Sequence, residues 1–225
     1  MKKILTLFLI GLLLYSCQKK QDNPTVIPKK NTNSYQPSTA GSYWVYPLDS
    51  TSFDQLDTIQ ATSQDTVIDG NTYKVFVSHK GKAKSYFRKF EDKYYQYNFK
   101  MNVNNLPDSL NALLGNVKSL KLLYLKDNLK VGDTWHNQFS NNSFNFRLIY
   151  TVVEKGGTKI VNGVTYNDVI GIHAALFQTV FLMGIPFNGL DDTKVDQSDF
   201  TCYYANNVGL ISTSKGQKLL HYEIK

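Results

Sequence analysis

Hydrophobic and polar residues alternate along several segments of the chain, which is the pattern of β-strands that bury one face. The clearest segment is 144–152, where one face carries Phe144, Phe146, Leu148, Tyr150 and Val152. In a second segment, 94–101, one face carries Tyr95, Tyr97, Phe99 and Met101. In a third segment, at the end of the sequence, the face expected to point inward carries Leu220, Tyr222 and Ile224. This pattern predicts a mainly β fold, a curved antiparallel sheet (half-barrel or sandwich) with one packed face and one wet face.

Glycine-containing dipeptides mark the turns between these strands. Asp69-Gly70 and Asn162-Gly163 are residue pairs that tolerate positive φ at both central positions of a type I′ turn. Each pair therefore predicts a tight two-residue hairpin. Gly156-Gly157 predicts another tight turn.

One short helix is expected near residues 107–118. Apolar residues recur there at the i, i+4, i+7, i+8 spacing of a single stripe, namely Leu106, Leu110, Leu113, Leu114 and Val117. Pro107 suits the first turn of such a helix. We expect this helix to cover an apolar face of the sheet.

The β-rich domain is expected to consist of two related meander halves, residues 41–128 and 129–225. Three pairs of segments recur in the same order: Gly41–Trp44 with Gly132–Trp135, Val67–Tyr73 with Ile160–Tyr166, and Tyr94-Tyr95 with Tyr203-Tyr204. The second half carries about sixteen additional residues before its tyrosine pair. Because Trp44 and Trp135 begin the two halves, we predict that they are equivalent core anchors. Convergent turn chemistry is the alternative explanation for the Asp-Gly and Asn-Gly matches.

The N-terminal region is expected to be a secretion signal followed by a tether. Two lysines precede an apolar run, residues 4–14, which is too short to span a bilayer and is followed by Cys17. The next twenty or so residues are rich in proline and polar side chains and show no apolar period. We therefore expect a signal peptide at 1–16, a disordered tether at 17–40 and a single β-rich domain at 41–225.

The charge distribution argues against a nucleic-acid-binding surface. The formal net charge is +7, but six of the 25 basic residues and only one of the 18 acidic residues lie in residues 1–30. The remainder carries 19 basic and 17 acidic residues. A nearly neutral body offers no basic face for a phosphate backbone, so no nucleic-acid partner is expected. The lysines of the tether either attract anionic lipid headgroups or keep the tether solvated.

Recognisable catalytic motifs are missing from the sequence. It has no Gly-x-Ser-x-Gly elbow, no His-Glu-x-x-His pair, no phosphate-binding glycine loop and no Cys-x-x-Cys pair. The four histidines are scattered singly, and Cys202 lies in a strand-like segment that predicts a buried, unreactive thiol. We therefore expect that the protein is not an enzyme and uses no cofactor.

Residues 174–187 form an apolar segment in the longer second half. One interpretation is an apolar flap over the concave face of the sheet, with a lipid-like ligand bound by Phe177, Phe181, Met183 and Phe187. The other is a β-hairpin or strand extension that packs into the core and turns at Gly184-Ile185-Pro186. Four aspartates follow this segment, namely Asp191, Asp192, Asp196 and Asp199. They are weak candidates for binding calcium, because their spacing does not match the twelve-residue calcium loop. The alternative is a solvated acidic loop.

Four motifs resemble those of a group of small, mostly uncharacterised lipoproteins of Gram-negative bacteria. They are GSYWVY at 41–46, KVGDTW at 130–135, VNGVTY at 161–166 and YYANNVGLI at 203–211. The stretch Leu14-Tyr15-Ser16-Cys17 resembles a lipobox, which implies that Cys17 is diacylated and anchors the protein in a membrane. Residue 18, which follows the lipobox cysteine, is glutamine and not aspartate. By the same resemblance, this implies that the protein is anchored in the outer membrane, facing either the periplasm or the cell surface.

The expected curved sheet is also similar in fold type to the half-barrel of lipoprotein carriers, whose hollow face holds acyl chains. These resemblances imply a lipid-anchored envelope lipoprotein that binds a hydrophobic or envelope-derived ligand without catalysis. The alternative is a structural or interaction lipoprotein that has no small-molecule ligand. Neither the ligand nor a protein partner is identified by the sequence.

Overall fold

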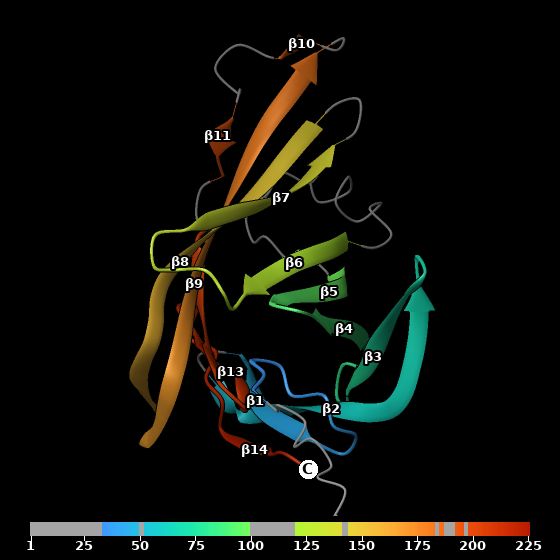
Figure 1. Cartoon of the computed structure of the whole chain (residues 1–225), viewed down its shortest axis with the longest axis vertical. Helices are drawn as coiled ribbons and strands as arrows, with labels where there is room; N and C mark the ends of the chain where they lie inside the picture. Colours follow the sequence, from blue (N-terminus) through green and yellow to red (C-terminus); the bar gives the residue numbers. More distant parts are fainter. Residues whose placement is uncertain are drawn as a thin grey trace, which may run out of the picture. The chain divides into compact units, whose positions relative to one another are not determined.

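Two antiparallel β-sheets make up the part of the chain that the structure describes (Figure 1). This computed structural model describes residues 33–49, 52–99, 120–140, 144–182, 185–186, 192–195 and 198–225. The prediction of a mainly β fold with a strongly curved antiparallel sheet is confirmed. The helix predicted near 107–118 lies outside the described residues. Within the described ranges, no helix has the length and apolar character needed to cross a membrane.

The two sheets differ in the part of the chain that builds them. Sheet A has the spatial order β14 (His221–Glu223), β1 (Tyr43–Asp49), β2 (Ser52–Ile68), β3 (Asn71–Ser78), β4 (Lys84–Phe90), β5 (Lys93–Phe99) and β6 (Leu120–Lys126). Sheet B has the order β13 (Gly209–Thr213), β12 (Phe200–Ala205), β9 (Val164–Leu182), β8 (Phe144–Val161) and β7 (Thr134–Ser140). The short strands β10 (Ile185–Pro186) and β11 (Thr193–Lys194) also pair with β9. Each half of the sequence therefore forms a meander, and only β14 crosses to the sheet of the other half.

Both predicted type I′ hairpins are confirmed by the backbone. Asp69 and Gly70 have φ values of 49° and 72°, and Asn162 and Gly163 have values of 50° and 78°. Ile68 pairs with Asn71 directly across the first turn, and the second turn joins β8 to β9 in the same way. Positive φ at both central positions matches the twist of the flanking strands, so these turns set the register of the longest hairpins.

The tight turn predicted at Gly156-Gly157 is wrong, because β8 continues through both glycines. Gly156 has a φ of 71°, and the register with β9 shifts between Lys155 and Gly157. A glycine in the left-handed region lets one strand accommodate an extra residue while pairing continues, which makes this a β-bulge. The two glycines therefore bend β8 rather than end it.

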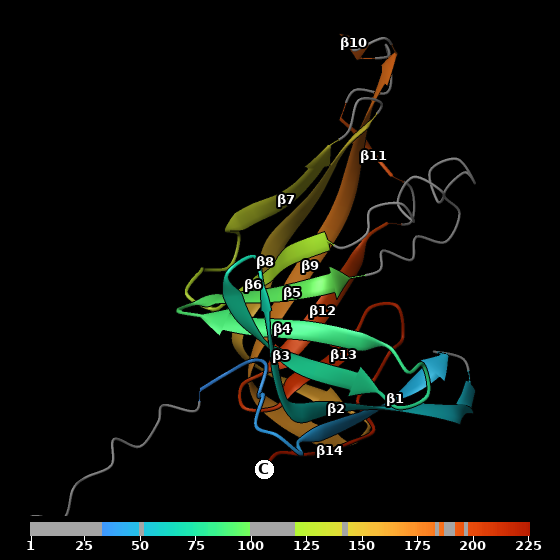
Figure 2. The same ribbon diagram turned by 90° about the vertical axis from the view of Figure 1, so that its right-hand side faces the viewer.

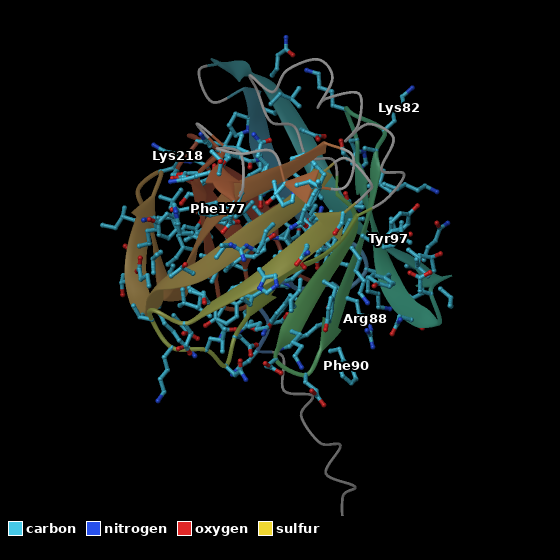
Figure 3. All side chains as sticks on the ribbon, turned by 90° about the horizontal axis from the view of Figure 1, so that it is seen from above. Lys82, Arg88, Phe90, Tyr97, Phe177 and Lys218 are labelled. Carbon is cyan, nitrogen blue, oxygen red and sulfur yellow. The ribbon has the colours of Figure 1, made fainter. Side chains whose placement is uncertain are left out.

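The buried face of β8 is the predicted one, whereas that of β5 is the opposite of the sequence expectation. Along β8 the buried side chains are those of Phe146, Leu148, Tyr150 and Val152. On β5, Tyr94 is 1% exposed, while Tyr95 and Tyr97 are only partly buried. Figure 3 shows Tyr97 on the side of sheet A that faces away from sheet B. Both faces of β5 carry aromatic rings, so alternation alone did not identify the inner one.

The end of the described chain follows the predicted alternation. Tyr222 and Ile224 pack partly buried against a core cluster, while His221 and Glu223 are exposed. Leu220 is only half-buried, and its neighbour Leu219 is the fully buried leucine. The alternation therefore holds only from His221, where the extended strand begins. Before that point Leu219, and not Leu220, is the leucine buried in the core.

The predicted core anchors Trp44 and Trp135 are both buried, and each connects one half of the sequence to the other. The indole Nε1 of Trp44 donates a hydrogen bond of 2.6 Å to the carbonyl of Val208 in the second half. Nε1 of Trp135 donates one of 2.8 Å to the carbonyl of Leu123 in the first half. The duplication itself stays a prediction. The third pair of matching segments does not occupy equivalent strands. Counted along each sheet, Tyr94-Tyr95 lies in the fifth strand from β1, whereas Tyr203-Tyr204 lies in the fourth strand from β7.

Hydrogen bonds join the two sheets on both sides. Where β6 faces β7, the side-chain amide of Asn137 accepts from the Leu123 N–H at 3.0 Å and donates to the Leu123 carbonyl at 3.1 Å. On the other side, the segment that leads into β14 contacts β13, since the Leu219 N–H donates to the Ile211 carbonyl at 2.9 Å. The sheets therefore enclose a shared interior, which contains both hydrophobic clusters of the protein's described residues.

The folded body extends further toward the N-terminus than the predicted boundary at residue 41. Tyr35 is 7% exposed, and its hydroxyl donates to Asp168 Oδ1 at 2.9 Å. Its backbone N–H donates to the Tyr94 hydroxyl at 3.2 Å, and the Ser34 carbonyl accepts from the Asn207 N–H at 2.8 Å. The expected tether at 17–40 therefore overlaps the folded body from Asn33 onward. The polar composition of this segment gave no sign of the attachment, because Tyr35 is its one buried aromatic side chain and the other contacts involve polar residues.

Candidate ligand cavity

A cavity of about 340 Å³ lies between the two sheets. Sheet A contributes residues of β5 and β6, and sheet B contributes residues of β8, β9, β12 and β13. Figure 2 shows these strands crossing, with β5 and β6 in green and β9, β12 and β13 in orange to red. The volume lies at the lower end of the range of small-molecule sites, about 300–1,000 Å³.

Small side chains among aromatic rings create this space. On β9, Ala174 pairs in register with Tyr150 of β8 on one side and with Phe200 of β12 on the other. All three line the cavity, and Ala174 is 1% exposed. Because alternate residues of a strand share a face, Ile172 of β9 also faces the cavity. A methyl group between two rings leaves a volume that a larger residue at position 174 would fill.

The inner end of the cavity is apolar and buried, and its polar atoms have partners in the protein. Tyr124 Oη donates to Gln36 Oε1 at 3.4 Å. The hydroxyl of Tyr150 is hydrogen-bonded to the Asn137 side chain, and that of Tyr204 to the Cys202 thiol. Burial raises the pKa of all three tyrosines above the ordinary value, so these hydroxyls stay neutral at physiological pH.

The outer end of the cavity is polar and carries one cation. It is formed by Gln96 of β5 and by the turn that follows β13, which contributes Thr213, Lys215 and Gln217. The Thr213 N–H donates to the Gln217 carbonyl at 2.8 Å, and the Gly216 N–H donates to the Thr213 carbonyl at 3.2 Å. This turn holds the exposed Lys215 at the opening. Among the described residues that line the cavity, Lys215 is the single charged one.

Two of the four residues predicted to bind a ligand, Phe177 and Phe181, are described by the structure, and neither lines the cavity. Phe177 and Phe181 belong to β9 but have the opposite parity to Ile172 and Ala174, so they lie on its other face. Phe177 is labelled in Figure 3. Met183 and Phe187 lie outside the described residues. The segment before residue 183 is the predicted strand extension, with Leu176 1% exposed, and Ile185 pairs back onto Leu182 of the same strand.

The acidic residues considered for calcium have protein partners where they are described. Asp192 forms an ion pair with Arg147, and Asp199 forms one with Lys194. Asp191 and Asp196 lie outside the described residues. The ranges that the structure describes contain no group of three or more His, Cys, Asp and Glu side chains positioned for a metal ion. Ion pairing with the chain's own cations accounts for Asp192 and Asp199.

Cys202 lines the cavity, and its environment agrees with an unreactive thiol. Burial raises its pKa to about 11, although the hydrogen bond with Tyr204 acts in the opposite direction. The thiolate fraction at neutral pH is therefore far below that of an ordinary cysteine. By area Cys202 is only partly buried, because its side chain borders the cavity.

This raised pKa predicts a loss of stability at alkaline pH. The folded state holds the thiol proton more tightly than the unfolded state, so stability is complete below the unfolded pKa near 9 and falls as the pH approaches 11. The contribution of Cys202 is about 2–3 kcal/mol. Urea unfolding between pH 7 and pH 11 measures it, with Cys202→Ala as the comparison. An identical pH dependence in the two proteins contradicts the assignment, whereas a residual decline in both belongs to the buried tyrosines.

No protein-family model, no curated protein sequence and no solved structure matches this chain.

Proposed function

We propose that this protein is a lipid-anchored lipoprotein of the cell envelope that binds a hydrophobic or envelope-derived molecule between its two sheets. The observation that carries the proposal is the cavity with buried apolar walls and a polar opening. The lipobox-like sequence ending at Cys17 supports the membrane anchor, and Gln18 supports the outer membrane. The proposed role is binding without catalysis.

The apolar lining of the cavity supports binding. Leu122, Ile172 and Ala174 are among the side chains that border the space. A hydrophobic ligand that covers this lining removes apolar surface from water, which contributes about 25 cal/mol for each Å² buried. This gain favours an apolar molecule as the occupant.

A second candidate function, protein interaction, is favoured by the outer face of sheet A. Phe90 is 47% exposed, and the Arg88 guanidinium lies 4.8 Å from its ring centroid and 5.8 Å from that of Tyr95. Figure 3 shows Arg88 and Phe90 on the side away from sheet B. Arginine and aromatic side chains are enriched at protein interfaces. Crosslinking in intact membranes tests this role, and the absence of any stoichiometric partner argues against it.

Filling the cavity is expected to abolish ligand retention. Protein purified under mild conditions is analysed by native mass spectrometry, and the bound molecule is extracted with organic solvent. We expect the native protein to carry a ligand and Ala174→Phe to retain at least about tenfold less, because the added ring occupies the space between Tyr150 and Phe200. Ala83→Phe makes the same change at an exposed site and is expected to retain ligand as the native protein does.

Two outcomes contradict ligand binding in this cavity. One is a native protein that is consistently empty, and the other is undiminished retention by Ala174→Phe. The near-ultraviolet circular dichroism of each variant shows whether it has folded. Leu210→Phe, at a second position that lines the cavity, replaces Ala174→Phe should that variant fail to fold.

A further inference from the structure

We infer that the outer face of sheet A lies against the surface of an anionic lipid bilayer. This inference deepens the proposed function by naming the part of the protein that meets the membrane, and it rests on the proposed lipid anchor at Cys17. It is carried by the cations and aromatic rings that share this face, and by the place where the chain that leads to Cys17 joins the folded body.

Strand register places basic and aromatic side chains together on the face of sheet A that points away from sheet B. Phe90 of β4 pairs with Lys93 of β5, which in turn pairs with Lys126 of β6. Arg88 pairs with Tyr95 across β4 and β5. Directly opposed residues of neighbouring strands lie on the same side of a sheet, and Figure 3 shows Arg88 and Phe90 on this side. With Lys121, which lies over the Tyr95 ring, they form what we call the basic face: Arg88, Phe90, Lys93, Tyr95, Lys121 and Lys126.

Aromatic rings hold two of these cations in place. The Arg88 guanidinium lies 4.8 Å from the ring centroid of Phe90 and 5.8 Å from that of Tyr95. Nζ of Lys121 lies 5.0 Å from the same Tyr95 centroid. A cation–π contact positions a cation over a ring without neutralising its charge. Both cations therefore remain able to attract an anion.

The basic face carries an excess of positive charge. Three of its cations form no ion pair with the described residues, namely Arg88, Lys93 and Lys121. The turn between β4 and β5 contains two carboxylates, Glu91 and Asp92, and neither of them forms an ion pair with a described residue. Even with these two counted, the four cations of the face are in excess. The nearly neutral charge of the whole body conceals this local concentration.

The chain that leads to Cys17 joins the folded body beside the basic face. The Asn33 carbonyl accepts a hydrogen bond of 2.8 Å from Nζ of Lys89, a residue of the same strand as Arg88 and Phe90. Fifteen residues, 18–32, separate Asn33 from Cys17. At about 3.4 Å per residue they span at most about 50 Å. Within that range, contact with the bilayer is an intramolecular step, so a weak attraction is sufficient.

The composition of the basic face favours a lipid surface over a protein partner. Arginine is enriched at protein interfaces but lysine is depleted there, and three of the four cations on this face are lysines. Lysines and arginines around an exposed aromatic ring are typical of surfaces that bind anionic bilayers, where the ring enters the head-group region. Phe90, at 47% exposed, supplies such a ring. Protein interaction at the same face is then the competing outcome of the experiment.

Lysine footprinting of the native, acylated protein tests this orientation. The full chain is reconstituted in nanodiscs of phosphatidylcholine with or without phosphatidylglycerol, treated with an amine-reactive reagent and analysed by mass spectrometry. We expect Lys93 and Lys121 to react at least about fivefold more slowly in the anionic discs, because one net charge near such a surface favours docking by about that factor. High salt is expected to remove the difference. Lys218, which is exposed and lies away from Arg88 in Figure 3, is expected to react equally in both discs.

Two variants and three outcomes decide the inference. Arg88→Gln is expected to remove most of the protection of Lys93 and Lys121, whereas Lys218→Gln is expected to leave it unchanged. Equal reactivity of Lys93 and Lys121 in both discs, in protein that co-elutes with them, overturns the inference and leaves the proposed anchor and cavity intact. Protection in native membranes but not in anionic discs also overturns it, and supports protein interaction. Protein that co-elutes with neither disc overturns the anchor and this inference together.

Discussion

Truncation of Trp44 to alanine is expected to lower the free energy of unfolding by about 4 kcal/mol, near the upper end for a large core residue. The side chain is 2% exposed, and its ring centroid lies 5.7 Å from that of Phe76. Its indole N–H also donates to the Val208 carbonyl, so the substitution removes both packing and a hydrogen bond between the two halves. Urea unfolding monitored by circular dichroism measures the change.

Two further variants test this explanation. Trp44→Phe keeps an aromatic ring but leaves the buried Val208 carbonyl without its donor, and is expected to cost about 1–3 kcal/mol. Phe90→Ala removes an aromatic ring that is about half exposed and is expected to cost less than about 1 kcal/mol. If Trp44→Ala is no more destabilising than Phe90→Ala, Trp44 is not a core anchor.

Replacement of Cys17 by alanine is expected to shift the protein from the membrane fraction to the soluble fraction by more than tenfold. Two acyl chains give stable membrane attachment, whereas lysines near an anionic surface contribute only about 1 kcal/mol each. That smaller contribution is screened by salt. Fractionation before and after a high-salt wash therefore distinguishes acyl anchoring from charge attraction.

The other cysteine supplies the matched control for this experiment. Cys202→Ala removes the same side chain from the cavity wall and is expected to stay in the membrane fraction. Incorporation of radiolabelled palmitate is expected in the native protein and in Cys202→Ala but not in Cys17→Ala. If Cys17→Ala remains with salt-washed membranes as the native protein does, the proposed anchor is wrong, and the cavity is unaffected by that result.

Local patterns in the sequence predicted the parts of the fold that depend on neighbouring residues. The inner face of β8 was predictable because its buried positions are uniformly apolar, and the two type I′ turns because few dipeptides accept two positive φ values. The inner face of β5 was not, because Tyr94 and Tyr95 are equally suited to burial. Tyr35 was missed for a related reason, since one aromatic residue in a polar segment produces no periodic signal.

The cavity was not predictable in detail, because it depends on which residues meet across strands. The prediction selected the large rings of Phe177 and Phe181 on β9, and these lie on the face of that strand that does not border the cavity. A cavity forms where side chains are small, and here Ala174 lies between Tyr150 and Phe200 only because β9 pairs with β8 and β12 in that register. The sequence signal that did exist was the alanine itself, on the same face as Ile172.

The pairing of β1 with β14 has a consequence for biogenesis. Tyr43 of β1 and His221 of β14, whose side chains meet at 3.1 Å, are 178 residues apart in the sequence. A strand at the margin of a sheet exposes unpaired amide groups that promote association with other chains until its neighbour arrives. Because β14 is synthesised so much later, a nascent β1 has no partner on that side while most of the polypeptide emerges. A chaperone that shields this segment during synthesis or export would therefore act before the fold is able to protect itself.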